Sequence, residues 1–162
     1  MKKLLGIFGV FLFVFIVTAA INPQFLTAYN LQNTLKWTSL YAIISFGAAF
    51  VIITGGIDLS IGSVVGLSGS LLAWALTVKG WHPVLGIAAA IGVSLLIGLF
   101  HGLLITKVRL QPFVVTLCGL LLYRGAARYI TDDQSQGFED KFEGLRAVAA
   151  GKIPIGDAFA IP

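Results

Sequence analysis

Five long apolar runs divide this sequence, and they constrain its fold more than any other feature. Each run is close to the roughly 20 residues that a helix needs to cross a bilayer, and short polar links separate them. Only 11% of the residues are charged, against about 25% in typical soluble domains. We therefore predict an all-α, polytopic membrane protein with about five transmembrane helices, at Leu4–Ile21, Thr38–Thr54, Leu59–Val78, Pro83–Thr106 and Pro112–Ile130.

The first run has two interpretations. Two lysines followed by an apolar stretch and "TAA" are also typical of a secretory signal peptide with its cleavage site. The apolar core of a signal peptide usually has about 7–15 residues, and Leu4–Ile21 is longer than that. We expect a retained first helix, and cleavage is the alternative.

The positions of Lys and Arg predict the orientation, because cytoplasmic links of membrane proteins are enriched in both. Lys2 and Lys3 precede the first run, and Lys107 and Arg109 lie between the fourth and the fifth. Four crossings separate these two pairs, so both fall on the same side. We expect a cytoplasmic N-terminus. The basic residues form no stripe that would favour nucleic acid as a partner.

The acidic residues divide the chain into two parts. Six of the seven acidic residues lie after Thr131. We expect residues 1–131 to form the transmembrane region and residues 132–162 to form a short polar segment outside the cytoplasm. Within that segment Phe138, Phe142, Leu145 and Ala149 recur at helical spacing, which predicts a short surface helix.

The remaining acid, Asp58, lies in "TGGIDLS" between the second and third runs. A carboxylate at the centre of a spanning helix costs about 2.5–3.5 kcal/mol. Gly55 and Gly56 can break the second helix, and Asp58 or Ser60 can cap the third by accepting backbone N–H bonds. The break is either a cap alone or a cap that also borders a solute pathway, as in many transporters. The candidate residues are Thr54, Gly55, Gly56, Asp58, Ser60, Gly62, Ser63 and Gly66.

Small residues predict close helix packing. Gly62 and Gly66, and likewise Gly98 and Gly102, are four residues apart, which lets another helix backbone approach closely. Asp58 falls on the same four-residue spacing as the first pair. The one cysteine, Cys118, lies in an apolar run and is expected to be a buried small hydrophobe.

Three further polar residues of the apolar runs are candidates for a pathway or docking role. Arg124 and Arg128 are four apart and share a helix face. They either extend to the headgroups at the membrane surface or line or dock a polar ligand. His101 is either a packed, hydrogen-bonded residue or a polar residue of the pathway.

Catalytic and cofactor sites are not expected. No carboxylate lies at metal-ligand spacing from His82 or His101. The Gly151-Lys152 pair is followed by Ile153 and lacks the glycine spacing of a phosphate-binding loop. We expect a protein without its own ATPase activity, without a cofactor and without a metal.

Two blocks of sequence resemble a known family. "TGGIDLSIGSVVGLSG", residues 54–69, and "GLFHGLLITKVRLQPFVVTLCGLLLYRG", residues 98–125, resemble the permease subunits of ribose-type simple-sugar ABC importers. The stretch "NPQFLTAYNLQNTL" is similar to the segment after that family's first helix. This sequence has His101 where the family usually has Asn, and Gln111 where a second proline is common.

The resemblance implies a subunit that imports a ribose-like sugar through the bacterial inner membrane. Its implied partners are an ABC ATPase, a periplasmic sugar-binding protein, a second permease subunit and the lipid bilayer. Permeases of this family are about twice as long, so the chain is expected to be the N-terminal half, as a fragment or as part of a split permease. The alternatives are a permease for a nucleoside or autoinducer-2, and a membrane-associated remnant that does not transport.

Overall fold

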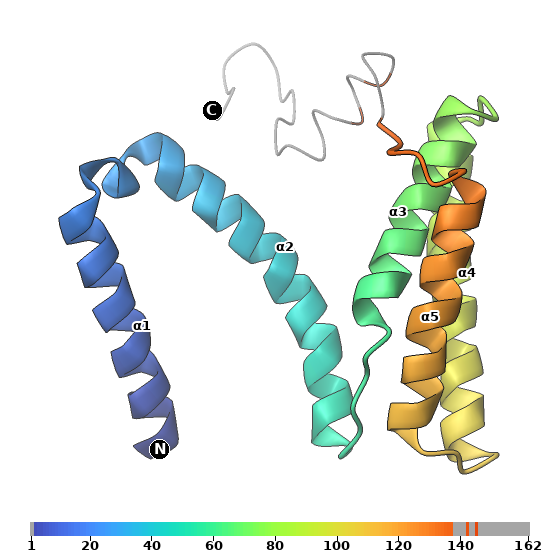
Figure 1. Ribbon diagram of the computed structural model, residues 1–162, viewed down its shortest axis with the longest axis horizontal. Helices are drawn as coiled ribbons and strands as arrows, with labels where there is room; N and C mark the ends of the chain where they lie inside the picture. The colour runs from blue at the N-terminus through green and yellow to red at the C-terminus, as the bar shows by residue number, and fades with distance from the viewer. Residues whose placement is uncertain (1, 138–141, 143–144, 146–162) are drawn as a thin grey trace. The chain divides into compact units, whose positions relative to one another are not determined.

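The computed structural model of the chain describes residues 2–137, 142 and 145, and its described part contains five α-helices (Figure 1). Three of them, α2, α4 and α5, are long and apolar enough to cross a membrane, and the other two are shorter apolar helices. The predicted all-helical membrane fold is confirmed. The short helix expected over residues 138–149 lies outside the described residues, apart from two positions. The helices are α1 (Lys2–Ile21), α2 (Ala28–Ile53), α3 (Ile61–Thr77), α4 (Pro83–Thr106) and α5 (Pro112–Ile130).

The chain forms two compact units, residues 1–50 and residues 51–162. In the first unit, a short 3-10 helix, η1 (Pro23–Leu26), joins α1 to α2. Asn22 begins η1 by accepting a hydrogen bond from the Gln24 backbone N–H at 3.0 Å. Phe25 then packs edge-on against Phe15 of α1, with 5.2 Å between the ring centroids. This contact fixes the turn at the end of α1.

The prediction for the start of α2 is wrong by ten residues. The helix begins at Ala28 rather than at Thr38. The Thr27 hydroxyl accepts a bond from the Asn30 N–H at 3.4 Å, and the Thr27 carbonyl accepts from the Leu31 N–H at 3.0 Å, so the first turn is capped within the polar link. Hydropathy indicates where a chain is apolar, and a capped helix can continue beyond that point into a polar stretch.

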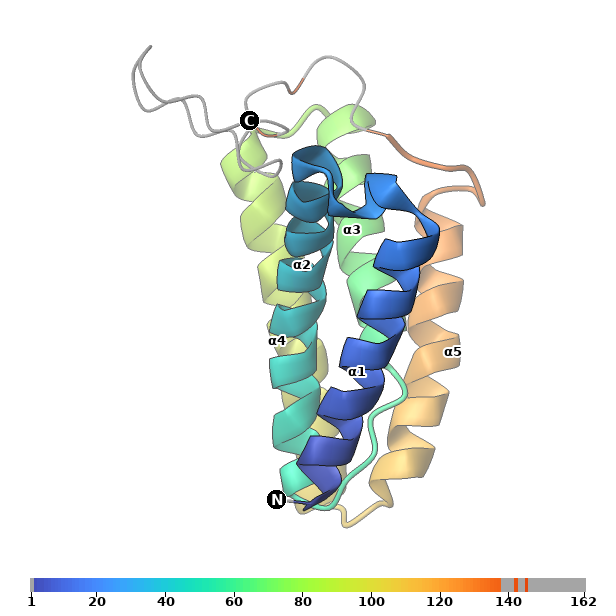
Figure 2. The same ribbon diagram turned by 90° about the vertical axis from the view of Figure 1, so that its left-hand side faces the viewer.

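In the second unit α3, α4 and α5 run alongside one another (Figures 1 and 2), and α3 contacts both of the others. The predicted starts of α4 and α5 are confirmed, because each begins at a proline in its first position. Proline is favoured there, since its missing N–H would have no partner inside the helix. The His82 side chain caps α4 by accepting from the Val84 N–H at 3.4 Å.

Close packing inside this unit uses two glycines that the small-residue pattern did not single out. A Cβ at Gly86 would lie 3.1 Å from Leu72 and Leu76 of α3, and one at Gly119 would lie 2.8 Å from the His101 ring. Among the described residues, nothing lies within 4 Å of a Cβ placed at the four glycines predicted to mediate packing, Gly62, Gly66, Gly98 and Gly102. The expectation that Cys118 is buried is also wrong, because its side chain is exposed on α5.

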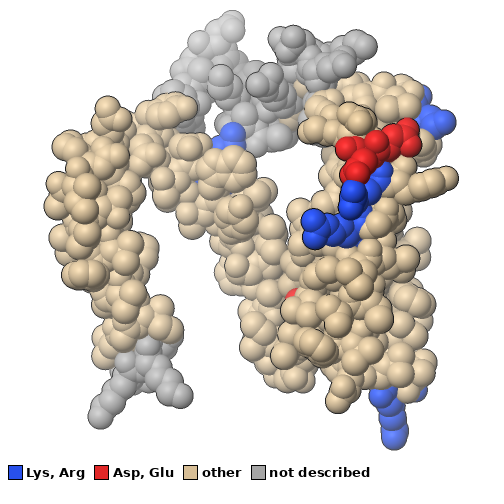
Figure 3. Space-filling model, in the orientation of Figure 1, with Lys and Arg blue, Asp and Glu red and all other residues tan. Residues whose placement is uncertain are grey.

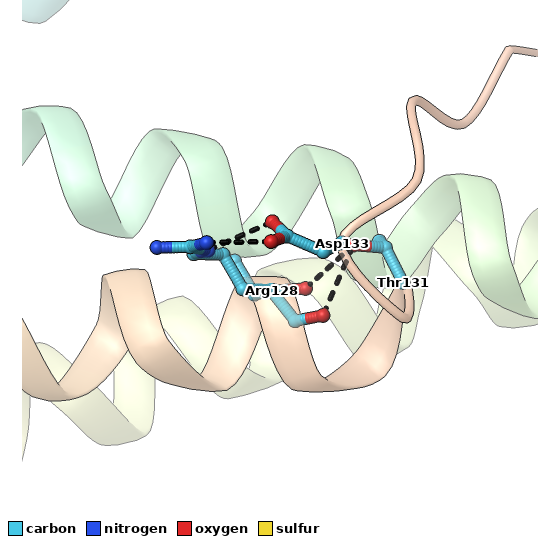
Figure 4. A network of polar contacts seen from close by, with 4 residues as sticks. Arg128, Thr131 and Asp133 are labelled. Atoms are coloured by element: carbon cyan, nitrogen blue, oxygen red, sulfur yellow. Dashed lines mark hydrogen bonds and ion pairs between the residues drawn. The ribbon is translucent and has the colours of Figure 1, made fainter.

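The last turn of α5 is closed by polar side chains (Figure 4). The Thr131 hydroxyl donates to the Ala127 carbonyl at 3.0 Å. The Arg128 Nε–H donates to the Asp133 carboxylate at 2.7 Å, and the second nitrogen reaches the other oxygen. This hydrogen bond lowers the pKa of the Asp133 carboxyl below its ordinary value. Both side chains are exposed, so the pair contributes little to stability.

We predict that Gly119→Ala destabilises the protein while Gly125→Ala does not. The added methyl group at 119 would meet His101 and Tyr123, whereas a Cβ at Gly125 has nothing within 4 Å. Overpacking costs about 1–3 kcal/mol, and alanine in an open helical position gains about 0.5–1 kcal/mol over glycine. Thermal unfolding of the two variants in detergent measures the difference. Equal midpoints would contradict the packing described here.

Candidate functional site

The interruption between α2 and α3 begins with a defined helix stop. Gly55 adopts the left-handed conformation, with φ of 77°. Its N–H donates to the Ile52 carbonyl at 2.9 Å, and the Gly56 N–H donates to the Val51 carbonyl at 3.0 Å. These two bonds form a Schellman motif, which ends a helix by satisfying its last carbonyls. The glycine pair therefore breaks the helix as predicted, and Gly55 supplies the backbone conformation that the motif requires.

Asp58, rather than Ser60, supplies the side chain that accepts a backbone N–H bond at this junction, just before α3 begins. The Asp58 Oδ1 accepts from the Ser60 N–H and from the Ser60 hydroxyl, both at 2.7 Å. Ser60 makes no side-chain cap of its own and is 1% exposed. Its carbonyl accepts the Ser63 hydroxyl at 2.7 Å. Asp58 lies outside α3 and so does not share a helical face with Gly62 and Gly66.

The interruption packs against the beginning of α5. The Thr116 hydroxyl, 2% exposed, donates to the Ile57 carbonyl at 3.2 Å while also reaching the Pro112 carbonyl of its own helix at 2.9 Å. A Cβ at Gly56 would lie 3.6 Å from the Pro112 Cβ. Gly56 and Ile57 thus pack against the first turn of α5.

The α3 helix is shorter than a full crossing of the hydrocarbon core. Its 17 residues extend about 25 Å at 1.5 Å per residue, less than the roughly 30 Å hydrocarbon core. The non-helical residues from Gly56 to Ser60 lead from the level of the α5 start to the beginning of α3 (Figure 1). The N-terminus of α3 and the Asp58 carboxylate consequently lie within the depth spanned by α5.

A second polar contact joins α4 to α5 beside the interruption. The Tyr123 hydroxyl and the His101 Nε2 are 2.8 Å apart, and the two residues are 6% and 7% exposed. Gly119 leaves room for both rings. His101 is thus a packed residue with a hydrogen-bond partner, which is one of the two interpretations of its sequence position. A role of His101 in a pathway stays a prediction.

Sequence reasoning missed the hydroxyl groups that complete this polar region. Thr116 and Tyr123 contact the interruption and His101, and Ser68 of α3 bonds Ser94 of α4 at 2.7 Å. Single polar residues inside apolar runs were the available signal, since such side chains often join helices in membranes. Their pairing depends on the rotation of each helix about its axis, which hydropathy does not give.

The structure does not bring Arg124 and Arg128 to the interruption. Both lie in the C-terminal third of α5, and both are exposed. Of the remaining candidates, Thr54 bonds the Val51 carbonyl at 2.8 Å, while Gly62 and Gly66 are exposed on α3. In the part of the chain that the structure describes, no group of His, Cys, Asp or Glu could hold a metal ion.

Comparison with known proteins identifies the family. The sequence model described as "Branched-chain amino acid transport system / permease component" matches residues 30–152. This chain belongs to that permease family. The match includes the interruption and all three helices of the second unit.

Several of the curated relatives are sugar permeases. The chain is 41% identical to the ribose import permease of Bacillus subtilis over 82% of its length, and 34% identical to that of Haemophilus influenzae over 85%. It is 36% identical to the xylose transport system permease of Escherichia coli over 68%. The matched regions cover 40%, 43% and 28% of these proteins, so the chain spans less than half the length of the relatives it matches. No solved structure matches the chain.

We predict that Tyr123→Phe lowers the free energy of unfolding by about 0.6–1.7 kcal/mol, the range for hydrogen bonds between membrane helices. The substitution removes the hydroxyl and leaves the buried His101 ring without this partner. A double-mutant cycle with His101→Leu, measured by unfolding in mixed micelles, isolates the pairwise energy. A coupling energy of zero would show that the two rings only pack.

Proposed function

We propose that this chain forms part of the permease subunit of a bacterial ABC importer for a simple sugar of the ribose type. The observation that carries the proposal is the 41% identity to a ribose import permease over 82% of the chain. Relatives for xylose and galactofuranose point to the same class of solute. The protein is a multi-pass protein of the bacterial inner membrane, as its family and its apolar helices indicate.

The interruption is our candidate for the part of the chain that borders the solute. A sugar carries many hydroxyl groups that need hydrogen-bond partners when they leave water. Thr54, Asp58, Ser60 and Ser63 place carboxylate and hydroxyl groups where a spanning helix would offer only apolar side chains. Non-helical backbone at membrane depth is tolerated where it is buried in protein or lines a water-filled cavity. These features favour a pathway role beyond that of a cap.

The partners and the orientation follow from the same proposal. A transporter of this class uses an ATPase subunit on the cytoplasmic side, a binding protein in the periplasm and a second permease subunit. The chain itself supplies no catalytic group in this scheme. Lys2, Lys3, Lys107 and Arg109 support a cytoplasmic N-terminus. Residues 132–162 would then begin on the periplasmic side, after the membrane region of residues 1–131.

Uptake by intact cells tests the proposed substrate. The complete permease gene is expressed with its ATPase and binding-protein genes in a strain that lacks ribose and xylose uptake. We expect labelled ribose or a related pentose to accumulate, and an excess of unlabelled pentose to compete. Competition by a nucleoside, by autoinducer-2 or by leucine instead would move the protein to another solute class. Absence of any uptake in a correctly inserted complex would favour the remnant.

Two substitutions at Asp58 separate the cap from the pathway. Asp58→Asn keeps an oxygen that can accept from the Ser60 N–H, whereas Asp58→Leu removes it. A hydrogen bond to a charged group is worth about 1.5–3 kcal/mol, so we expect the Asn variant to lose about tenfold or more in uptake rate. Immunoblots of membranes check insertion, which we expect to be retained. Wild-type uptake by Asp58→Asn would show that the residue is a cap alone.

A further inference from the structure

The charges of the second unit are distributed unevenly over its helices. The 24 residues of α4 include no Lys, Arg, Asp or Glu, whereas α5 carries Arg124 and Arg128. On the side drawn in Figure 3, charged side chains gather over the C-terminal part of α5, next to a broad uncharged surface. A helix that faces acyl chains has no reason to carry arginines, which are costly in hydrocarbon.

Arg124 lies well inside α5, so its side chain does not reach the headgroups at the membrane surface without difficulty. It is six residues before Ile130, the last residue of α5, which places its Cα about 9 Å from that end. Side chains of an α-helix lean toward the helix N-terminus. For Arg124 that direction leads away from the nearer membrane surface and toward the middle of the bilayer. Extension to the headgroups would have to overcome this lean.

Arg128 is accommodated differently. It is one turn closer to the end of α5 and donates to Asp133 beyond the helix (Figure 4). Its charge is thus neutralised at the membrane boundary. Arg124 is therefore the arginine of α5 that needs a polar environment inside the span.

The same flank of α5 continues toward the middle of the helix. Leu117, Leu121, Arg124 and Arg128 follow at spacings of four, three and four residues, so they share one face. This face is distinct from the buried one, which includes Thr116 and Tyr123. Leu117 and Leu121 are exposed. We call Leu117, Leu121, Arg124 and Arg128 the arginine flank.

We propose that the arginine flank of α5 borders a water-filled route for a hydroxyl-rich solute, and that the outer face of α4 lies against lipid. The proposal rests on the transport function proposed above. Water solvates the Arg124 guanidinium at membrane depth, and its five N–H donors match the oxygens of such a solute. The charge-free α4, whose exposed side chains include Leu95, Leu96 and Leu99, supplies the surface that lies against lipid.

Cysteine labelling in the complete permease distinguishes the two surfaces. Leu121 and Leu95 are a matched pair, since each lies in the middle of its helix and they are 66% and 68% exposed. Each is changed to Cys in a background without other cysteines, including Cys118→Ala. Whole importer complexes in membrane vesicles are treated with a charged methanethiosulfonate reagent, which reacts only in water.

We expect Leu121→Cys to react at least tenfold faster than Leu95→Cys, and its modification to block uptake, while modification of Leu95→Cys does not. Equal rates at the two positions would overturn the proposal. So would reaction of Leu121→Cys only with a lipid-soluble maleimide, which would place the flank against lipid, or with neither reagent, which would place it against protein. Labelling without loss of uptake would also overturn it, because the flank would then lie outside the route.

The labelling experiment distinguishes failure of the proposed substrate from failure of the proposed route. If the unmodified complex takes up no sugar but transports another solute, the proposed substrate fails, and the blocking experiment is repeated with that solute. If sugar uptake is normal and the two cysteines react equally, the substrate stands and the arginine flank does not border the route.

Discussion

The backbone of residues 54–60 lies outside both α2 and α3, so its N–H and carbonyl groups need hydrogen-bond partners other than those of a helix, and the second unit supplies several of them. Each unsatisfied N–H or carbonyl group in hydrocarbon costs several kcal/mol. The Schellman motif at Gly55, the Asp58 carboxylate and the Thr116 hydroxyl each satisfy one part of the interruption. Since Thr116 belongs to α5, that helix supplies one of the hydrogen bonds of the broken segment. The break between α2 and α3 and the packing of α5 beside it are therefore linked.

The helices themselves were largely predictable from the sequence. Apolar length indicated the number of helices in the described part of the chain, and proline and glycine indicated several of their ends, because both residues act through local backbone geometry. Pro83, Pro112 and Gly55 lie where the structure begins or ends a helix. The start of α2 was not predictable by length, since Thr27 caps that helix in a stretch that is polar. Hydropathy indicates whether a side chain favours an apolar environment, whereas the capping residue determines where the backbone becomes helical.

Contacts between helices were less predictable, and the glycines show the reason. The four-residue spacing of Gly62 and Gly66 was a stronger pattern than the isolated Gly119, yet of these three only Gly119 packs closely against another helix in the described structure. Spacing shows that residues share a face, but it does not show which neighbour that face meets. His101 illustrates the same limit. Its position in an apolar run showed that it needed a partner, and only the rotation of α5 identified Tyr123 as that partner.

The helix break also lowers the free-energy cost of the charged Asp58 carboxylate. In an unbroken helix the carboxylate would extend from a backbone that has no donors to spare. At the start of α3, the Ser60 N–H and hydroxyl both donate to it, and the positive end of the helix dipole faces it. The same groups that stabilise the charge keep one carboxylate oxygen occupied and leave the second to accept from elsewhere. A cap and the proposed solute contact are thus compatible functions of one side chain.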